Sequence, residues 1–180
     1  GVGFDTKGAG QLIIKGPSTK HEVDTYEIPD TREGWVESVK MLLDSYFLNT
    51  RVVLFQYDKI RPAGLPIKTF GGLSSGPDPL IQLHNDIRLT LNKIIGEPIT
   101  TTAIVDIMNH IGKAVVAGNV RRTAEIVFGD YKSDEYLDLK NYNVNPNREG
   151  FGWASNNSIF ADLGMNYFNS AERTKINGEP

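Results

Sequence analysis

Apolar residues recur at helical spacing in three stretches of the chain. The first stretch begins at Asp30 or Thr31, either of which can cap a helix, and runs to about Phe47. The second opens with Pro77 and ends near Gly96, and the third is capped within Thr100–Thr102. The expected buried stripes are Trp35, Val39, Leu42 and Tyr46, with Val36, Leu43 and Phe47 beside them; then Leu80, Leu83, Ile87, Leu91 and Ile94; then Ile104, Ile107, Ile111 and Val115.

Short apolar runs between the helical stretches predict strands. Val2–Phe4 and Leu12–Lys15 flank a glycine turn, and the nearly continuous run Val52–Gln56 is typical of a buried strand. Ala124, Ile126 and Phe128 alternate with Glu125 and Val127 in another, and 153–160 predicts a last strand. Ser133 is expected to cap a short helix through Lys140, whereas 16–29 and 141–152 are expected to be connectors. Helices and strands in this order predict an α/β fold.

Composition narrows the classes of protein that fit. Nineteen Lys and Arg against 22 Asp and Glu give a net charge of -3, so no overall basic field points to duplex nucleic acid. The chain has no cysteine, which excludes disulfides, thiolate zinc sites and thiol catalysis within it. No apolar run is long enough to predict a membrane span. His84 and His110 have no partner at a convincing metal spacing, so we expect solvated or core-edge histidines and no metal.

Residues 61–76 combine glycine, proline and serine with two cations, Arg61 and Lys68. Gly71, Gly72, Ser74 and Ser75 then lead into the helix that Pro77 opens. A glycine loop, hydroxyls and a helix N-terminus together form a layout that can cradle phosphate. A plain glycine–serine loop is the alternative, since the pattern is not a Walker sequence.

A second glycine-bearing connection follows the third helix. Gly118 and Asn119 are typical of a helix end, and Arg121 and Arg122 lie between them and the next strand. A guanidinium is suited to phosphate or base edges. From spacing alone, an exposed loop with two solvated charges is the favoured interpretation of this pattern.

Three segments carry a resemblance to a known family. Gly118-Asn119-Val120-Arg121-Arg122-Thr123-Ala124-Glu125-Ile126 resembles the second specificity loop of ribonucleotide reductase large subunits. Together with residues 1–10 and Trp153-Ala154-Ser155-Asn156-Asn157-Ser158, it is most similar to the monomeric adenosylcobalamin-dependent ribonucleoside-triphosphate reductases. The resemblance covers essentially the whole chain in one order.

The resemblance implies a partial reductase barrel, in which strands alternate with helices, with an inserted helical and loop segment. Residues 1–28 would be a barrel strand and connector, 29–91 an insertion that imitates a dimer partner and binds the effector, and 92–180 the return to the barrel core. Because the chain starts without Met and ends at 177–180 on Asn-Gly-Glu-Pro, we expect an internal piece of a longer enzyme.

The same resemblance assigns roles to the loops. Residues 61–76 are similar to the first specificity loop, in which Arg61 and Lys68 would hold the phosphates of a dNTP effector with the backbone and hydroxyls of 71–75; Lys68 stands where the family has arginine. Asp30-Thr31-Arg32-Glu33-Gly34-Trp35 is similar to the start of the family's dimer-interface helix, which implies that Asp30 helps to hold the effector. Gly118, Asn119, Arg121 and Arg122 would form the loop that senses the effector base.

The family reaction replaces the ribose 2′-hydroxyl by hydrogen through a cysteine thiyl radical that adenosylcobalamin generates. The catalytic cysteines would lie outside this chain, as would most of the cobalamin site, so the chain alone is expected to be inactive. Implied partners are a ribonucleoside triphosphate, a dNTP effector and a thioredoxin-type reductant, in a cytoplasmic monomer without nucleic acid or membrane. The alternative is a stand-alone dNTP-binding regulatory module without catalysis.

Overall fold

The computed structural model describes residues 1–20, 22–67, 71–117 and 123–180. The chain divides into two compact units, each described here by itself. Unit 1 comprises Gly1–Gln11, Ile99–Val115 and Thr123–Pro180, and unit 2 comprises Leu12–Pro98 and Val116–Arg122. Within the described part of the chain, no helix combines the length and apolar character needed to cross a bilayer.

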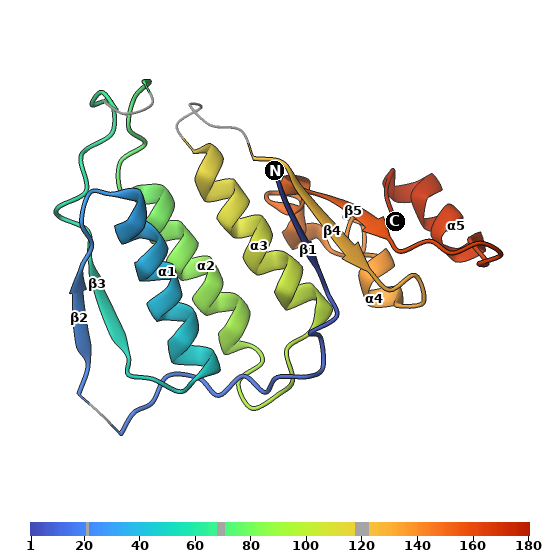
Figure 1. Ribbon diagram of the computed structural model, residues 1–180, viewed down its shortest axis with the longest axis horizontal. Coiled ribbons are helices and arrows are strands. Elements are labelled where there is room, and N and C mark those ends of the chain that lie inside the picture. The colour runs from blue at the N-terminus through green and yellow to red at the C-terminus, as the bar shows by residue number, and fades with distance from the viewer. Residues whose placement is uncertain (21, 68–70, 118–122) are drawn as a thin grey trace. The chain divides into compact units, whose positions relative to one another are not determined.

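Unit 1 is built on a three-stranded parallel sheet with the order β1-β4-β5 (Figure 1). Its strands are β1 (Val2–Asp5), β4 (Glu125–Gly129) and β5 (Ser155–Ile159), and its helices are α3 (Thr101–Val116), α4 (Asp134–Leu137) and α5 (Phe168–Asn177), with short 3-10 turns at Pro146–Arg148 and Gly152–Ala154. In register, Glu125 pairs with Val2 on one side and with Ser155 on the other. Because β4 is hydrogen-bonded on both sides, it is the central strand.

The core of unit 1 gathers buried residues from α3, from β4 and from the segment around α4: Val105, Val127, Tyr136, Leu137 and Leu139. The hydroxyl of Tyr136 lies within hydrogen-bond distance of the carbonyl oxygens of Val127 (2.9 Å) and Ser158 (2.6 Å), which share its single proton. It also accepts from the amide of Ser158 at 2.9 Å. A single buried phenol therefore links α4 to two neighbouring strands.

Unit 2 contains helices α1 (Arg32–Phe47) and α2 (Asp78–Asn92) and a parallel pair of strands, β2 (Asp24–Glu27) and β3 (Val53–Gln56). Figure 1 shows β2 and β3 on one side of α1 and α2 on its other side. The core of this unit includes Leu42 and Tyr46 from α1 and Leu80, Ile87 and Leu91 from α2. The predicted stripe of α2 is thus confirmed at Leu80, Leu83, Ile87 and Leu91, whereas Ile94 lies beyond the end of the helix and is only partly buried.

The helix starts agree closely with the sequence. Thr31 is the N-cap of α1, where its hydroxyl accepts from the amide of Gly34 at 3.0 Å. Thr100 accepts in the same way from Ala103 at 3.0 Å, and Ser133 from Tyr136 at 3.2 Å. Side-chain capping is a local interaction, so the sequence alone is enough to locate it.

The buried face of α1 agrees less well with the face that the sequence predicted. On α1 the buried residues are Gly34, Ser38, Leu42, Ser45 and Tyr46, and the expected Trp35 and Val39 are only partly buried. Val36 is 63% exposed. The expected stripe is therefore confirmed at Leu42 and Tyr46 and wrong at Trp35 and Val39, where the preceding small residues Gly34 and Ser38 are buried instead.

Two strand faces were also predicted wrongly. On β3 only Val53 is buried and Leu54 is 58% exposed, so the strand is not buried throughout. On β4, Glu125 and Val127 face inward whereas Ile126 is 37% exposed. Two elements were missed altogether: β2, which lies inside the expected connector, and α5. Their short or weakly apolar sequences give little periodicity to detect.

The compact unit 2 starts at Leu12, ahead of the expected insertion start at residue 29, because β2 pairs with β3. The segment Leu12–Lys15 contributes isolated bridges from Ile13 and Ile14 and forms no full strand. The division into 1–28, 29–91 and 92–180 stays a prediction.

Candidate effector-binding site

The glycine-rich stretch 61–76 folds back on itself. Pro66 and Leu73 form an antiparallel bridge, and the amide of Ser74 donates to the carbonyl oxygen of Leu65 at 2.8 Å. Gly71 and Gly72 have φ values of 72° and 84°, a left-handed backbone that glycine adopts without strain. The two arms of this glycine- and proline-rich stretch therefore pair locally.

Asp30 and Arg61 come together although they lie far apart in the sequence. The Nε atom of Arg61 donates to Oδ2 of Asp30 at 2.6 Å, and Nη1 donates to the carbonyl oxygen of Pro66 at 3.1 Å. Each side chain of the pair is about one-third exposed, at 32% and 33%. Because Asp30 precedes the N-cap of α1, this contact places the Arg61 guanidinium at the start of that helix.

Ser74 extends this cluster. Its hydroxyl donates to the carbonyl oxygen of Arg61 at 3.4 Å and accepts from the amide of Gly76 at 3.0 Å. The amide of Gly71 donates to the carbonyl oxygen of Ile67 at 3.0 Å. These amides and this hydroxyl hold the loop in shape, so an anion would have to use other donors of the loop or displace these contacts.

Several predicted site residues lie outside the described residues. They are Lys68, Gly118, Asn119, Arg121 and Arg122. Of the predicted effector residues, the structure links Asp30, Arg61 and Ser74 in one hydrogen-bonded chain. Across the residues that are described, no three His, Cys, Asp or Glu side chains gather into a group that could hold a metal ion.

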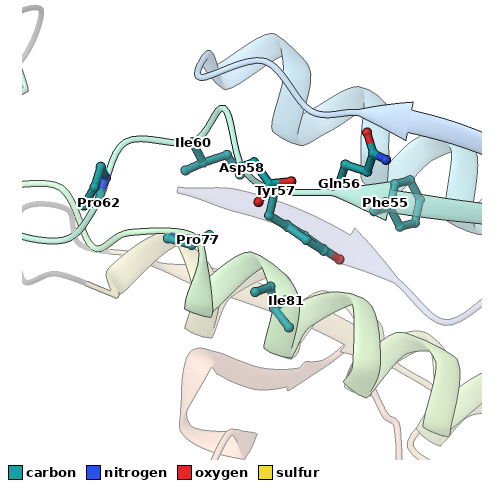
Figure 2. Close-up of a pocket in the computed structure, with 8 residues that line it drawn as sticks. All are labelled: Phe55, Gln56, Tyr57, Asp58, Ile60, Pro62, Pro77 and Ile81. Atoms are coloured by element: carbon teal, nitrogen blue, oxygen red, sulfur yellow. The ribbon is translucent and has the colours of Figure 1, made fainter.

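A pocket of about 530 Å³ lies beside the loop, between the end of β3 and the start of α2. Figure 2 shows its lining, in which Tyr57 and Ile81 come from the two opposite walls. Pro62 and Pro77, at the two ends of the glycine-rich loop, also line it. Asp58 is the acidic residue of this lining, so the pocket is better suited to an uncharged group than to a triphosphate.

His84 corrects the expectation of a solvated or core-edge histidine. Its side chain is 1% exposed, and each ring nitrogen faces a hydroxyl: Ser38 Oγ at 3.0 Å from Nε2 and Tyr57 Oη at 2.7 Å from Nδ1. Burial, with a smaller contribution from Arg88, lowers the pKa of His84 to about 4. At neutral pH the ring is uncharged and links α1, α2 and the residue that follows β3.

His110 is 7% exposed, and its ring lies 4.1 Å from that of Phe151, centroid to centroid. It too is more deeply buried than expected. The amphipathic pattern did not identify either histidine as a core residue, because histidine carries no apolar signal.

Unit 1 holds a buried acid that the sequence analysis did not single out. Glu125 is 6% exposed, and burial raises the pKa of its carboxyl to about 7. The available signal was Gly112, an isolated glycine inside an otherwise apolar helix, which commonly marks a close approach. A Cβ on Gly112 would lie 2.5 Å from Oε1 of Glu125.

Comparison with known proteins identifies the class to which this architecture belongs. Residues 8–91 match the family described as B12-dependent ribonucleotide reductase, insertion domain. A crystal structure of a B12-dependent (class II) ribonucleotide reductase matches the fold with a TM-score of 0.80 and 32% identity, covering 100% of this chain and 29% of that chain. The α/β fold is thus that of a class II ribonucleotide reductase segment.

The sequence relatives agree. The adenosylcobalamin-dependent ribonucleoside-triphosphate reductase of Euglena gracilis is 55% identical over 180 residues, which is 100% of this chain and 25% of that protein. Its counterpart in Lactobacillus leichmannii is 40% identical over 161 residues, or 86% of this chain and 22% of that protein. The chain belongs to the B12-dependent ribonucleotide reductase family and spans about a quarter of the length of these relatives.

Proposed function

We propose that this chain is the specificity-controlling segment of an adenosylcobalamin-dependent ribonucleoside-triphosphate reductase. Such an enzyme replaces the ribose 2′-hydroxyl by hydrogen, starting from a cysteine thiyl radical for which the cofactor supplies the radical chemistry. Since this chain has no cysteine, the reacting sulfurs and most of the cobalamin site would belong to other parts of the longer protein. The three parallel strands β1, β4 and β5 would be part of its barrel.

The Asp30–Arg61 pair carries the effector part of this proposal. Two residues assigned to the same ligand from separate sequence segments lie 2.6 Å apart at the start of a long helix. A helix start favours anions, and a partly exposed guanidinium can add donors for phosphate oxygens. We infer that a dNTP binds here through its phosphates, with Arg61, Lys68, Gly71, Gly72, Ser74 and Ser75 as phosphate contacts and Asp30 near the sugar.

The base-sensing part is assigned to Gly118, Asn119, Arg121 and Arg122. A loop that contains glycine can adopt several arrangements at little conformational cost. An effector can shift the substrate preference only if its base binds those arrangements unequally. Arg121 or Arg122 would then be placed toward the substrate base or away from it.

Substitution of the paired arginines tests this function. Arg121→Ala and Arg122→Ala in the full-length reductase should reduce the effector-dependent change in base preference more than they lower turnover without effector. The measurement is the ratio of kcat/KM for two ribonucleoside triphosphates with and without each dNTP. Arg51→Ala is the matched control, since Arg51 is an exposed arginine of unit 2 that pairs with Asp24. A wild-type response in both loop variants would refute the assignment.

A further inference from the structure

Glu125 is an unusual residue to find at the start of a central strand. Its side chain is 6% exposed, and its Oε2 atom has no hydrogen-bond partner among the described residues. A buried acid without full hydrogen bonding costs free energy unless it stays protonated or performs a task. Packing alone therefore does not explain why an acidic residue occupies this position.

Gly112 supplies the other half of the contact. An added Cβ would lie 2.5 Å from Oε1 and 3.0 Å from Cδ of Glu125, and 3.2 Å from Cβ of Ala154. No larger residue fits without displacing the carboxyl. A glycine inside a helix costs about 0.5–1 kcal/mol relative to alanine, so both sides of this contact, the buried acid and the glycine, are locally unfavourable.

The two residues lie at the two ends of the second specificity loop. Gly112 is about one turn before the end of α3 at Val116, and Glu125 is the first residue of β4. The strand end is already fixed by the sheet, since the amide of Val2 donates to the carbonyl oxygen of Ala124 at 2.9 Å. The Glu125 carboxyl extends from that fixed strand and lies against the helix, since a Cβ on Gly112 would meet its Oε1 atom at 2.5 Å.

We propose that Glu125 is a positioning residue for the second specificity loop. With its carboxyl seated against Gly112, it sets the separation between the end of α3 and the start of β4. That separation limits which arrangements the segment between them can adopt, and so how strongly an effector can redirect Arg121 and Arg122. Glu125 acts through the loop and touches neither substrate nor effector. This inference rests on the proposed function of the loop.

The test uses the full-length reductase and three variants: Glu125→Gln, Glu125→Ala and Gly112→Ala. Glu125→Gln keeps the size of the side chain and should retain the effector-dependent change in base preference within about twofold. Glu125→Ala removes the contact and Gly112→Ala displaces the carboxyl, so both should reduce that change by about fivefold or more, a typical allosteric coupling. The reduction should exceed any fall in effector-free kcat.

Two further variants separate positioning from loss of structure. Gly150→Ala is the glycine control, since a Cβ there meets nothing within 4 Å, and it should behave as wild type. Gly112→Ala combined with Glu125→Asp shortens the acid by one methylene and makes room for the added methyl group. This double variant should recover part of the effector response, which a merely destabilised protein would not do.

The outcomes distinguish this inference from the function on which it rests. A wild-type response in Gly112→Ala and Glu125→Ala, together with a flattened response in the Arg121 and Arg122 variants, would overturn the role of Glu125 alone. A wild-type response in the arginine variants would overturn the loop assignment itself. If Glu125→Ala does not fold, the comparison of Gly112→Ala with the double variant Gly112→Ala/Glu125→Asp tests the proposal. A folded double variant that recovers none of the effector response would count against it.

Discussion

The two compact units each bury an ionisable side chain, and they treat it in opposite ways. In unit 2, His84 has a hydroxyl on each ring nitrogen, so its neutral form is fully hydrogen-bonded. In unit 1, Glu125 keeps an oxygen without a partner among the described residues, and a glycine makes room for it. The first arrangement is typical of a scaffold, because a satisfied polar group fixes one packing. The second is typical of a position under functional constraint.

One ion pair from each unit shows a second contrast. Unit 1 also buries the pair formed by Arg148, 1% exposed, and Asp106, with Nε and Oδ1 2.7 Å apart. The corresponding pair in unit 2, Arg61 and Asp30, is one-third exposed. A buried ion pair is costly to break, whereas the cation of a partly exposed ion pair can leave its carboxylate and bind a ligand instead. The Arg148–Asp106 pair thus suits a structural role, and the Arg61–Asp30 pair is the one whose arginine is open to solvent.

The largest expected loss of stability comes from breaking the buried Arg148–Asp106 pair. Arg148→Met should destabilise unit 1 by about 3–5 kcal/mol, because it removes a cation from a buried carboxylate and also the contact of Nη1 with the carbonyl oxygen of Leu139. Hydrogen exchange with mass spectrometry measures this for the peptides of each unit. Hydrogen-exchange protection in α1 and α2 should change little. An equal loss of protection in both units would contradict the idea that the buried pair stabilises unit 1 alone.

The pH dependence of stability should have opposite signs in the two units. The pKa of His84 falls on folding from 6.5 to about 4, so its contribution to unit 2 is complete above pH 6.5 and is lost as the pH falls toward 4. The pKa of Glu125 rises from 4.5 to about 7, so its contribution to unit 1 is complete below pH 4.5 and is lost as the pH rises through 7. Each amounts to about 3 kcal/mol at most.

Hydrogen-exchange protection at pH 5 and pH 7.5, corrected for intrinsic exchange rates, measures how the stability of each unit changes with pH. His84→Gln should flatten the slope of unit 2 only, and Glu125→Gln that of unit 1 only. If the two units shift in the same direction, the contrast between the two buried groups is wrong.

A smaller effect concerns the exposed pair. Asp30→Asn should weaken dNTP binding to the full-length reductase by about 1–3 kcal/mol, because the carboxylate proposed to hold the effector sugar loses its charge and, with it, one charge-assisted hydrogen bond. Titration calorimetry measures the affinity. Asp24→Asn, which alters another exposed Arg–Asp pair of unit 2, is the control and should bind normally.

The smallest effect is local. Thr31→Ala removes the cap of α1 and should destabilise unit 2 by about 1 kcal/mol. Thr31→Ser, which keeps the hydroxyl, should recover most of the loss in the same exchange measurement. A loss confined to unit 1 would show that the cap does not act where the structure places it.

Much of the local structure could be predicted from the sequence. The span of α1 agrees within one or two residues, and β4 and β5 form where the alternating and polar runs predicted strands. The cap residues Thr31, Thr100 and Ser133 were also located correctly. These features depend on neighbours within a few residues, which the sequence contains directly.

The candidate site was predictable only with the family resemblance. Spacing alone left a plain loop as the alternative for residues 61–76, and only the fold brings Asp30 to Arg61 across the sequence. The ion pair arises because the residue that precedes α1 lies beside the loop that precedes α2. No periodicity in either segment encodes that contact.

By itself, the sequence determined helices α1 to α4, the strands that have clear patterns, and the chemistry available in each loop, because these follow from short-range preferences of the backbone and from side-chain type. The tertiary structure decided which face of each element is buried, that His84 lies in the core, and that Gly112 accommodates Glu125. Burial depends on what packs against an element from elsewhere in the chain, so a polar residue on the inner face becomes visible only when its partner is in place.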